Sequence, residues 1–153
     1  MASKYLLKII TKKEKETQKV GKILAEEILR TRVKPKVIAL IGELGSGKTT
    51  FIKGFASGLK INKKIISPSF LIFKEYPFLY KKEKYTFYHW DLYRLNKKKE
   101  IFDLGFKKII GDPKNIVAIE WADKIKNILP KNSFKIYFYH KSPKERKIEL
   151  KIN

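Results

Sequence analysis

Residues 37–52, VIALIGELGSGKTTFI, decide the fold, because an apolar run leads there into a glycine-studded turn. The run 37–41 is typical of a buried strand, and residues 50–59 suit a helix. Four residues between them match the pattern G-x-x-x-x-G-K-S/T, namely Gly42, Gly47, Lys48 and Thr49. A strand before this motif and a helix after it are the context of a phosphate-binding loop, which we therefore predict here.

Each part of this loop has a chemical role. Glycines lack the Cβ atoms that would keep backbone N–H groups away from phosphate oxygens at the start of a helix. We expect Lys48 to bind the β and γ phosphates, and the Thr49 hydroxyl to bind Mg2+, a hard cation that prefers oxygen ligands. The chain has no N-K-x-D stretch of the kind that reads guanine, so ATP is the predicted nucleotide.

Length and composition place limits on the kind of protein. A chain of 153 residues with 43% hydrophobic content predicts one compact domain over residues 1–153. The absence of cysteine excludes disulfides, thiolate zinc sites and a cysteine nucleophile. We find neither a signal peptide nor an apolar run of membrane-spanning length, so we expect a cytoplasmic protein with no membrane partner.

The formal net charge of +21 suggests nucleic-acid binding, because basic side chains neutralise phosphates. Of the 36 basic residues, four are arginine and 36 − 4 = 32 are lysine, spread over nearly every segment. Solvated lysines on surface faces are the usual explanation of such a distribution. Direct tRNA binding by a basic surface therefore stays an alternative.

The rest of the pattern predicts a mixed sheet within a three-layer α/β fold, in which parallel core strands carry added antiparallel hairpins. Thr11 and Glu14 form a capping-box signature for a first helix that ends near Arg30. The other predicted elements are a strand at 5–10, a hairpin whose tip is 77–84, short helices at 97–105 and 123–129, a strand at 115–120, and a final hairpin of strands 133–140 and 146–152.

A small polar insertion, Ser67-Pro68-Ser69, interrupts the apolar and aromatic stretch 65–76. One interpretation is a turn or bulge where Pro68 breaks a ladder of strand hydrogen bonds. The other is a switch-like loop whose hydroxyl reaches the γ-phosphate or its Mg2+. This stretch by itself leaves both interpretations open.

Two predicted strands end in carboxylates. Asp91 follows YTFYHW and Glu120 ends NIVAIE, and carboxylates at such ends of nucleotide-binding sheets meet Mg2+ or orient water. Glu120 fits the Walker B description better, but the sequence does not decide between them. Arg94 stands out in a lysine-rich chain, since guanidinium pairs bidentately with carboxylate or phosphate. His89 is a further candidate because it neighbours Asp91.

Five stretches, in order and spacing, resemble the TsaE (YjeE) family: GELGSGKTTF, SPSFLIFKEY, YHWDLYRL, EIFDLGF and AIEWADKI. The resemblance implies a bacterial P-loop ATPase that is required to make threonylcarbamoyladenosine beside the anticodon of tRNA. It also implies Mg-dependent ATP hydrolysis that is weak alone and stimulated by a TsaB–TsaD heterodimer, with tRNA contacted through that complex.

The resemblance also implies roles for particular residues. Lys48, Asp91 and Glu120 look catalytic. The implied metal ligands are Thr49, Ser69, Asp91 and Glu120, and the implied nucleotide-binding residues are Glu43, Leu44, Gly45, Ser46, Gly47, Lys48, Thr49, Thr50 and Trp121. Four positions depart from the family: Ser69 stands where threonine is usual, Trp90 where other apolar residues are common, and Lys107 and Lys108 where acidic residues are expected.

A small-molecule kinase is a competing interpretation of the same loop. Such an enzyme needs an acceptor pocket and usually a lid rich in arginine, and four arginines argue against it. A tRNA-binding module with a nucleotide site is the third interpretation.

Overall fold

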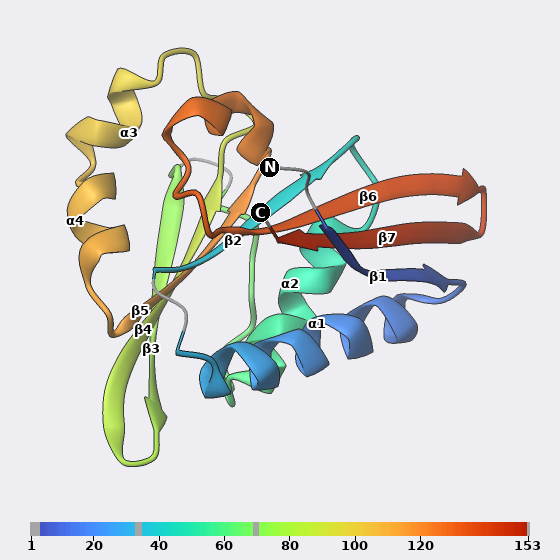
Figure 1. Ribbon diagram of the computed structural model, residues 1–153, viewed down its shortest axis with the longest axis horizontal. Helices are drawn as coiled ribbons and strands as arrows, with labels where there is room; N and C mark the ends of the chain where they lie inside the picture. The colour runs from blue at the N-terminus through green and yellow to red at the C-terminus, as the bar shows by residue number, and fades with distance from the viewer. Residues whose placement is uncertain (1–3, 33–34, 69–70, 153) are drawn as a thin grey trace.

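The computed structural model describes residues 4–32, 35–68 and 71–152, and in it seven strands form one mixed sheet in the order β1-β7-β6-β2-β5-β4-β3 (Figure 1). The strands are β1 (Lys4–Thr11), β2 (Lys36–Gly42), β3 (Phe73–Tyr80), β4 (Glu83–Asp91), β5 (Asn115–Glu120), β6 (Phe134–Ser142) and β7 (Glu145–Ile152). The helices are α1 (Glu14–Arg30), α2 (Lys48–Gly58), α3 (Lys99–Asp103), α4 (Phe106–Gly111) and the 3-10 helix η1 (Ala122–Ile128).

The centre of the sheet is parallel and both its margins are antiparallel. Strands β6, β2, β5 and β4 run in one direction, while β3 pairs antiparallel with β4, and β7 and β1 add antiparallel strands beyond β6. The predicted mixed sheet with added hairpins is therefore confirmed.

Alternate side chains of β2 point into two separate cores. Ile38 and Leu40 pack in the cluster that contains α1 and α2, whereas Val37 and Ala39 pack in the cluster that contains α3, α4 and η1. A strand buried on both faces needs apolar residues at every position, which explains the continuous run in the sequence. The parallel strands β2, β5 and β4 are thus the middle of three layers (Figure 1).

The antiparallel margin is covered differently. Phe134, Ile136 and Phe138 of β6 and Ile148 of β7 belong to the core under α1 and α2. None of the described residues of β1, β7 or β6 belongs to the second core. Within the described part of the chain, this half of the sheet therefore packs helices against one face alone.

The start of α1 corrects a prediction. Its N-cap is Lys13, and the Glu16 carboxylate reaches back to accept the backbone N–H groups of Lys12 at 2.6 Å and Lys13 at 3.1 Å. The predicted capping box of Thr11 and Glu14 is wrong, because the Thr11 hydroxyl is buried and bonds the Thr17 hydroxyl at 2.7 Å instead.

Three other boundaries also differ. The hairpin tip is residues 81–82 rather than 77–84, because Pro77 is tolerated in β3, an edge strand. The predicted helix 97–105 is shorter, α3, and a left-handed Gly105 separates it from α4, which was not predicted. The helix predicted at 123–129 is the 3-10 helix η1.

No helix in the described residues is both long enough and apolar enough to span a membrane.

The contact between α1 and α2 requires glycine at position 54. A Cβ atom there would lie 1.9 Å from the backbone oxygen of Gln18 in α1, which is far inside van der Waals contact. The two helices can therefore lie this close because Gly54 has no side chain, and α2 carries Lys48 at its first position.

We predict that Gly54→Ala lowers the free energy of unfolding by about 1–3 kcal/mol, because α1 must move away from the added methyl group. Gly111→Ala is the matched control, since no atom lies within 4 Å of its added Cβ. Urea denaturation of both variants checks the prediction, and equal stability of the two would contradict it.

Candidate functional site

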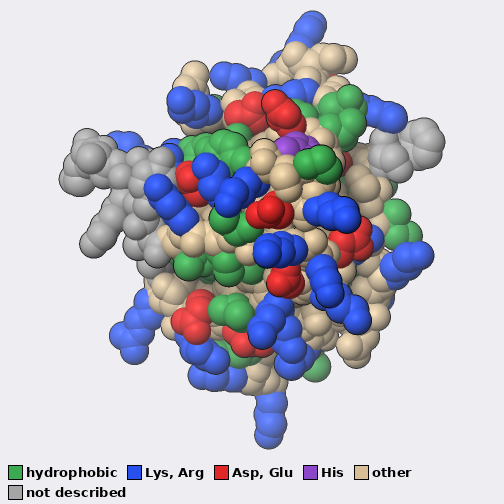
Figure 2. All heavy atoms as spheres, turned by 90° about the vertical axis from the view of Figure 1, so that its right-hand side faces the viewer, with side chains coloured by type: hydrophobic (Ala, Val, Ile, Leu, Met, Phe, Trp, Pro, Cys, Tyr) green, Lys and Arg blue, Asp and Glu red, His purple; other side chains and the backbone are tan. Residues whose placement is uncertain are grey.

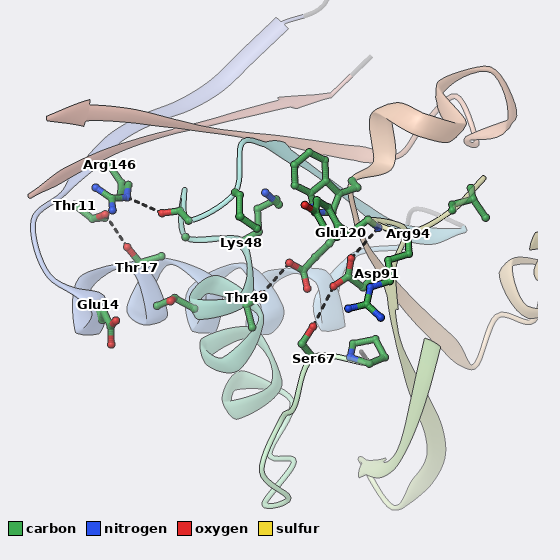
Figure 3. Close-up of a pocket in the computed structure, with 18 of the residues that line it drawn as sticks. Thr11, Glu14, Thr17, Lys48, Thr49, Ser67, Asp91, Arg94, Glu120 and Arg146 are labelled. Carbon is green, nitrogen blue, oxygen red and sulfur yellow. Dashed lines mark hydrogen bonds between the residues drawn. The ribbon is translucent and has the colours of Figure 1, made fainter. Parts of the chain in front are cut away.

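One cleft of about 830 Å3 brings together most of the residues singled out in the sequence (Figure 3). It is bordered by the loop between β2 and α2, the carboxyl ends of β4 and β5, the start of α1 and the turn between β6 and β7. The predicted residues among its lining are Leu44, Gly45, Gly47, Lys48, Thr49, Thr50, Ser67, Asp91, Arg94, Glu120 and Trp121.

The loop before α2 turns at Gly47, whose φ of 106° is a left-handed conformation that favours glycine. Helix α2 begins at Lys48, two residues earlier than predicted. Lys48 Nζ donates to the backbone oxygens of Gly42 at 2.5 Å and Glu43 at 2.8 Å. The ammonium also lies 4.3 Å from the centroid of the Trp121 ring, a cation–π distance.

Burial lowers the pKa of Lys48, and the negative charges of Glu120 and Asp91 act in the opposite direction. The ammonium is therefore partly desolvated within an acidic surrounding. Such a group gains strongly from contact with a further anion, because charges interact more strongly where water is partly excluded.

The two acidic strand ends are neighbours. Strands β4 and β5 are parallel, and their register pairs Asp91 directly with Glu120. Thr49, the second residue of α2, donates its hydroxyl to Glu120 Oε1 at 2.9 Å. The sheet register thus places both carboxylates beside α2.

The second oxygen of Glu120 is held by His89, whose Nε2 lies 2.6 Å from Oε2. Glu120 is 3% exposed and His89 is fully buried. His89 Nδ1 has no partner among the described residues, and a buried N–H without an acceptor is rarer and costlier than a bare lone pair. The proton therefore lies on Nε2, which donates to the carboxylate.

Asp91 is held by the hydroxyl-containing loop. Its Oδ2 accepts the Ser67 hydroxyl at 3.1 Å, and its Oδ1 accepts the backbone N–H of Tyr93 at 3.0 Å. Ser67 and Pro68 precede β3 and lie outside the ladder, so the bulge interpretation is wrong for these two residues. Ser69 lies outside the described residues, and its predicted metal contact stays a prediction.

Some predicted residues do not border the cleft. The Ser46 side chain is 1% exposed, and Glu43 borders a separate hollow of about 270 Å3 beside β6. Lys107 and Lys108, in α4, are also absent from the lining. Among predicted loop residues, Glu43 and Ser46 therefore present no side chain to this space.

Arg146 is a cleft residue that the sequence interpretation missed. Its Nε donates to the Gly45 carbonyl at 3.3 Å, and its Nη1 donates to carbonyls of the β6–β7 turn. His140 Nε2 lies 3.3 Å from the Leu44 carbonyl. The paired ends of β6 and β7 therefore support the loop between β2 and α2 from the side opposite Glu120. The scarcity of arginine in the sequence was the signal that could have identified Arg146. Arg94 and Arg146 are two of the four arginines, and both line the cleft.

The donor set fits Mg2+ if a nucleotide supplies further oxygens. Mg2+ is usually bound by one or two carboxylates together with phosphates and water, and Thr49, Glu120 and Asp91 offer one hydroxyl and two carboxylates. No cluster of three or more histidine, aspartate or glutamate side chains suited to a metal occurs in the described residues. A cation here would need ligands that the described side chains do not provide.

Comparison with known families decides the classification. The family model described as "Threonylcarbamoyl adenosine biosynthesis protein TsaE" matches residues 11–148. The chain belongs to the TsaE family. The TsaE stretches in the sequence thus fall within one continuous match that runs from the end of β1 into β7.

Two curated relatives carry the name tRNA threonylcarbamoyladenosine biosynthesis protein TsaE. The protein from Bacillus subtilis is 36% identical over 143 residues, which are 93% of this chain and 83% of the relative. The protein from Rickettsia felis is 40% identical over 126 residues, 79% of this chain and 66% of the relative. The match thus spans slightly less than two thirds of the Rickettsia felis protein.

A solved structure has the same fold. The crystal structure of YdiB from Bacillus subtilis superposes with a TM-score of 0.71 at 32% sequence identity, covering 99% of this chain and 88% of the other. The mixed sheet and its helices are therefore also the architecture of the YdiB structure.

We predict that His89→Leu lowers the free energy of unfolding by about 1–3 kcal/mol, because the buried Glu120 carboxylate loses a donor. His89→Gln should be less destabilising, since its amide can still donate. His140→Leu is the comparison at an exposed position, where the lost hydrogen bond to the Leu44 carbonyl is open to water and costs less. Urea denaturation measures all three, and a His89→Leu variant as stable as the parent would show that the pair contributes nothing.

Proposed function

We propose that this TsaE-family chain is a Mg-dependent ATPase that supports threonylcarbamoyladenosine modification of tRNA. The observation that carries the proposal is the Thr49–Glu120 hydrogen bond at 2.9 Å in the same cleft as Lys48. A P-loop lysine, a hydroxyl and a strand-end carboxylate are the parts that phosphoryl-transfer sites of this class share.

Lys48 is proposed to bind the phosphates. Its two present acceptors, the carbonyls of Gly42 and Glu43, are neutral, so exchanging them for phosphate oxygens strengthens the interaction. The backbone N–H groups that follow Gly47 start a helix, and helix N-termini favour anions. Together they stabilise charge that develops on the transferred group.

Thr49 and Glu120 are proposed as the metal side of the site, and Asp91 as the water side. The Thr49 hydroxyl and Glu120 Oε1 already point at each other, whereas Asp91 is oriented separately by Ser67 and Tyr93. Bound Mg2+ supplies neutralisation of the phosphate oxygens. Asp91 accepts a hydrogen bond from the attacking water and so orients it toward phosphorus.

The nucleoside end is proposed to lie beyond the loop, toward the start of α1. The cleft extends there past Gly45 to Thr11, Thr17 and Arg146. Arg146 presents a planar group on this wall, and guanidinium planes stack on aromatic bases. This placement lets one cleft hold both ends of ATP.

The pathway is proposed from the relatives, whose names place them in tRNA threonylcarbamoyladenosine biosynthesis. In this proposal the chain hydrolyses ATP weakly alone, and a TsaB–TsaD pair stimulates it. The threonylcarbamoyl transfer takes place on the partner pair, so this chain contacts tRNA's modification site through that complex.

We expect Lys48→Ala to abolish ATP turnover, because the phosphates lose their cation. The measurement is phosphate release by the chain together with the TsaB–TsaD pair, and tRNA modification is scored in the same reaction. Turnover equal to that of the parent under stimulation would overturn the assigned mechanism.

Replacing each carboxylate by its isosteric amide distinguishes the role of Asp91 from that of Glu120. Asp91→Asn should bind Mg-ATP nearly normally but lose at least about 100-fold in turnover, because water is no longer oriented. Glu120→Gln should raise the Mg2+ concentration needed for binding of a fluorescent ATP analogue. If the two variants exchange these behaviours, the assigned roles are reversed.

A further inference from the structure

The half of the sheet formed by β1, β7 and β6 has one face without a helix among the described residues. We call it the lysine–tyrosine face. Its described side chains are Lys135, Tyr137 and Tyr139 from β6, Lys147, Glu149 and Lys151 from β7, and Lys8 and Ile10 from β1.

Strand register places these side chains on one face. Lys135 pairs with Lys151, Tyr137 with Glu149 and Tyr139 with Lys147, and Glu149 in turn pairs with Lys8 of β1. Directly paired residues share a face of a sheet. The residues between them, such as Ile136 and Ile148, point into the core on the opposite side.

Two aromatic rings on this face are each associated with a cation. Lys147 Nζ lies 4.7 Å from the centroid of the Tyr139 ring, and Lys151 Nζ lies 4.7 Å from that of Tyr137. Tyr139 is 40% exposed. Each tyrosine ring therefore has a lysine ammonium within cation–π distance.

The face is also hollowed. A depression of about 270 Å3 lies between the tyrosines and the end of β2, and its lining includes Ile41, Gly42 and Glu43. A ring that stands beside a depression offers a base both a stacking surface and a place to enter. A flat, solvated surface of lysines has neither feature.

Positive charge alone does not locate this site. Figure 2 shows the side of the molecule at the β6–β7 turn, where lysine and arginine side chains are scattered among acidic and apolar ones. The lysine–tyrosine face differs by composition, since its described side chains on paired strands are four lysines, two tyrosines, one isoleucine and one glutamate. Aromatic rings interleaved with cations on an open sheet are the physical basis of single-strand recognition.

We propose that the lysine–tyrosine face binds single-stranded RNA, such as an unpaired loop of a folded RNA. Tyr137 and Tyr139 stack successive bases, and the surrounding lysines neutralise the phosphates between them. A duplex buries its bases against each other and leaves no base face for these rings. The proposal goes beyond ATP hydrolysis and does not depend on it.

The binding face lies next to the P-loop. His140, the residue after Tyr139, contacts the Leu44 carbonyl, and Glu43 borders the depression. An RNA base in this depression would therefore lie against the back of the loop whose front borders the nucleotide cleft. Bound RNA would therefore contact this loop directly.

The test measures fluorescence anisotropy of a labelled oligouridylate of about 12 nucleotides, a length within the range of single-strand sites, without nucleotide. We expect the combined variant Lys8→Gln, Lys135→Gln and Lys151→Gln to bind at least about 10-fold more weakly at physiological salt. The slope of log affinity against log salt should fall in magnitude by about 2, because each of the three lost phosphate contacts contributes about 0.7 to the slope. This variant leaves Lys147 and Glu149, which are 3.4 Å apart, intact.

The matched control removes the same charge elsewhere. Lys15, Lys19 and Lys22 are exposed on α1, which packs against the other face of the sheet, and their combined change to glutamine should weaken binding less than about threefold. Equal losses in the two triple variants would overturn the proposal, because binding would then follow net charge alone.

The rings are tested separately. Tyr137→Leu with Tyr139→Leu should weaken binding about 10-fold or more without changing the salt slope, and the paired phenylalanine variant should restore it. A matching RNA duplex should bind more weakly than the single strand. No loss with leucine, or equal binding of the duplex, would refute the proposal. Binding of a fluorescent ATP analogue should be unchanged in the leucine variant, so this result is independent of the ATPase proposal.

Discussion

A buried carboxylate connects the three elements that build the cleft. Glu120, at the end of β5, accepts hydrogen bonds from Thr49 in α2 and from His89 in β4. Leaving such a group without donors would cost several kcal/mol, roughly the cost of desolvating a charge. Helix α2, strand β5 and its neighbour β4 are therefore held in one relative position, and Asp91 is placed with them because it lies in register beside Glu120.

The antiparallel half of the sheet supports the same loop from the other side. The β6–β7 turn places Arg146 and His140 against the carbonyls of Gly45 and Leu44. The loop between β2 and α2 therefore lies between His140 and Arg146 on one side and Glu120 on the other. Its glycines leave the backbone N–H groups accessible. The strands that provide this brace have helices against one face among the described residues, which leaves the lysine–tyrosine face available for binding. Loop support and RNA binding would then be two uses of one hairpin.

Patterns that are local in the sequence predicted the structure well. Residues 115–120 form a strand with the predicted bounds, because a continuous apolar run is required where both faces are buried. The first-helix cap was wrong because Thr11 is bonded to Thr17 across the turn, which leaves Glu16 to cap the backbone. Helix α4 was missed because its N-cap, Gly105, has no side chain to signal a helix start.

The sequence by itself determined the G-x-x-x-x-G-K-T motif between a strand and a helix, the two acidic strand ends and the lysine-rich composition, since each is set by residues close together in the chain. Tertiary structure alone decided which donors hold each carboxylate, how Arg146 reaches the loop, and which lysines share a face with tyrosines. These are contacts across long separations: Thr49 and Glu120 are 71 positions apart, and Arg146 and Gly45 are 101 apart. Strand order and register set them, and both follow from how the two cores pack on opposite faces of the sheet.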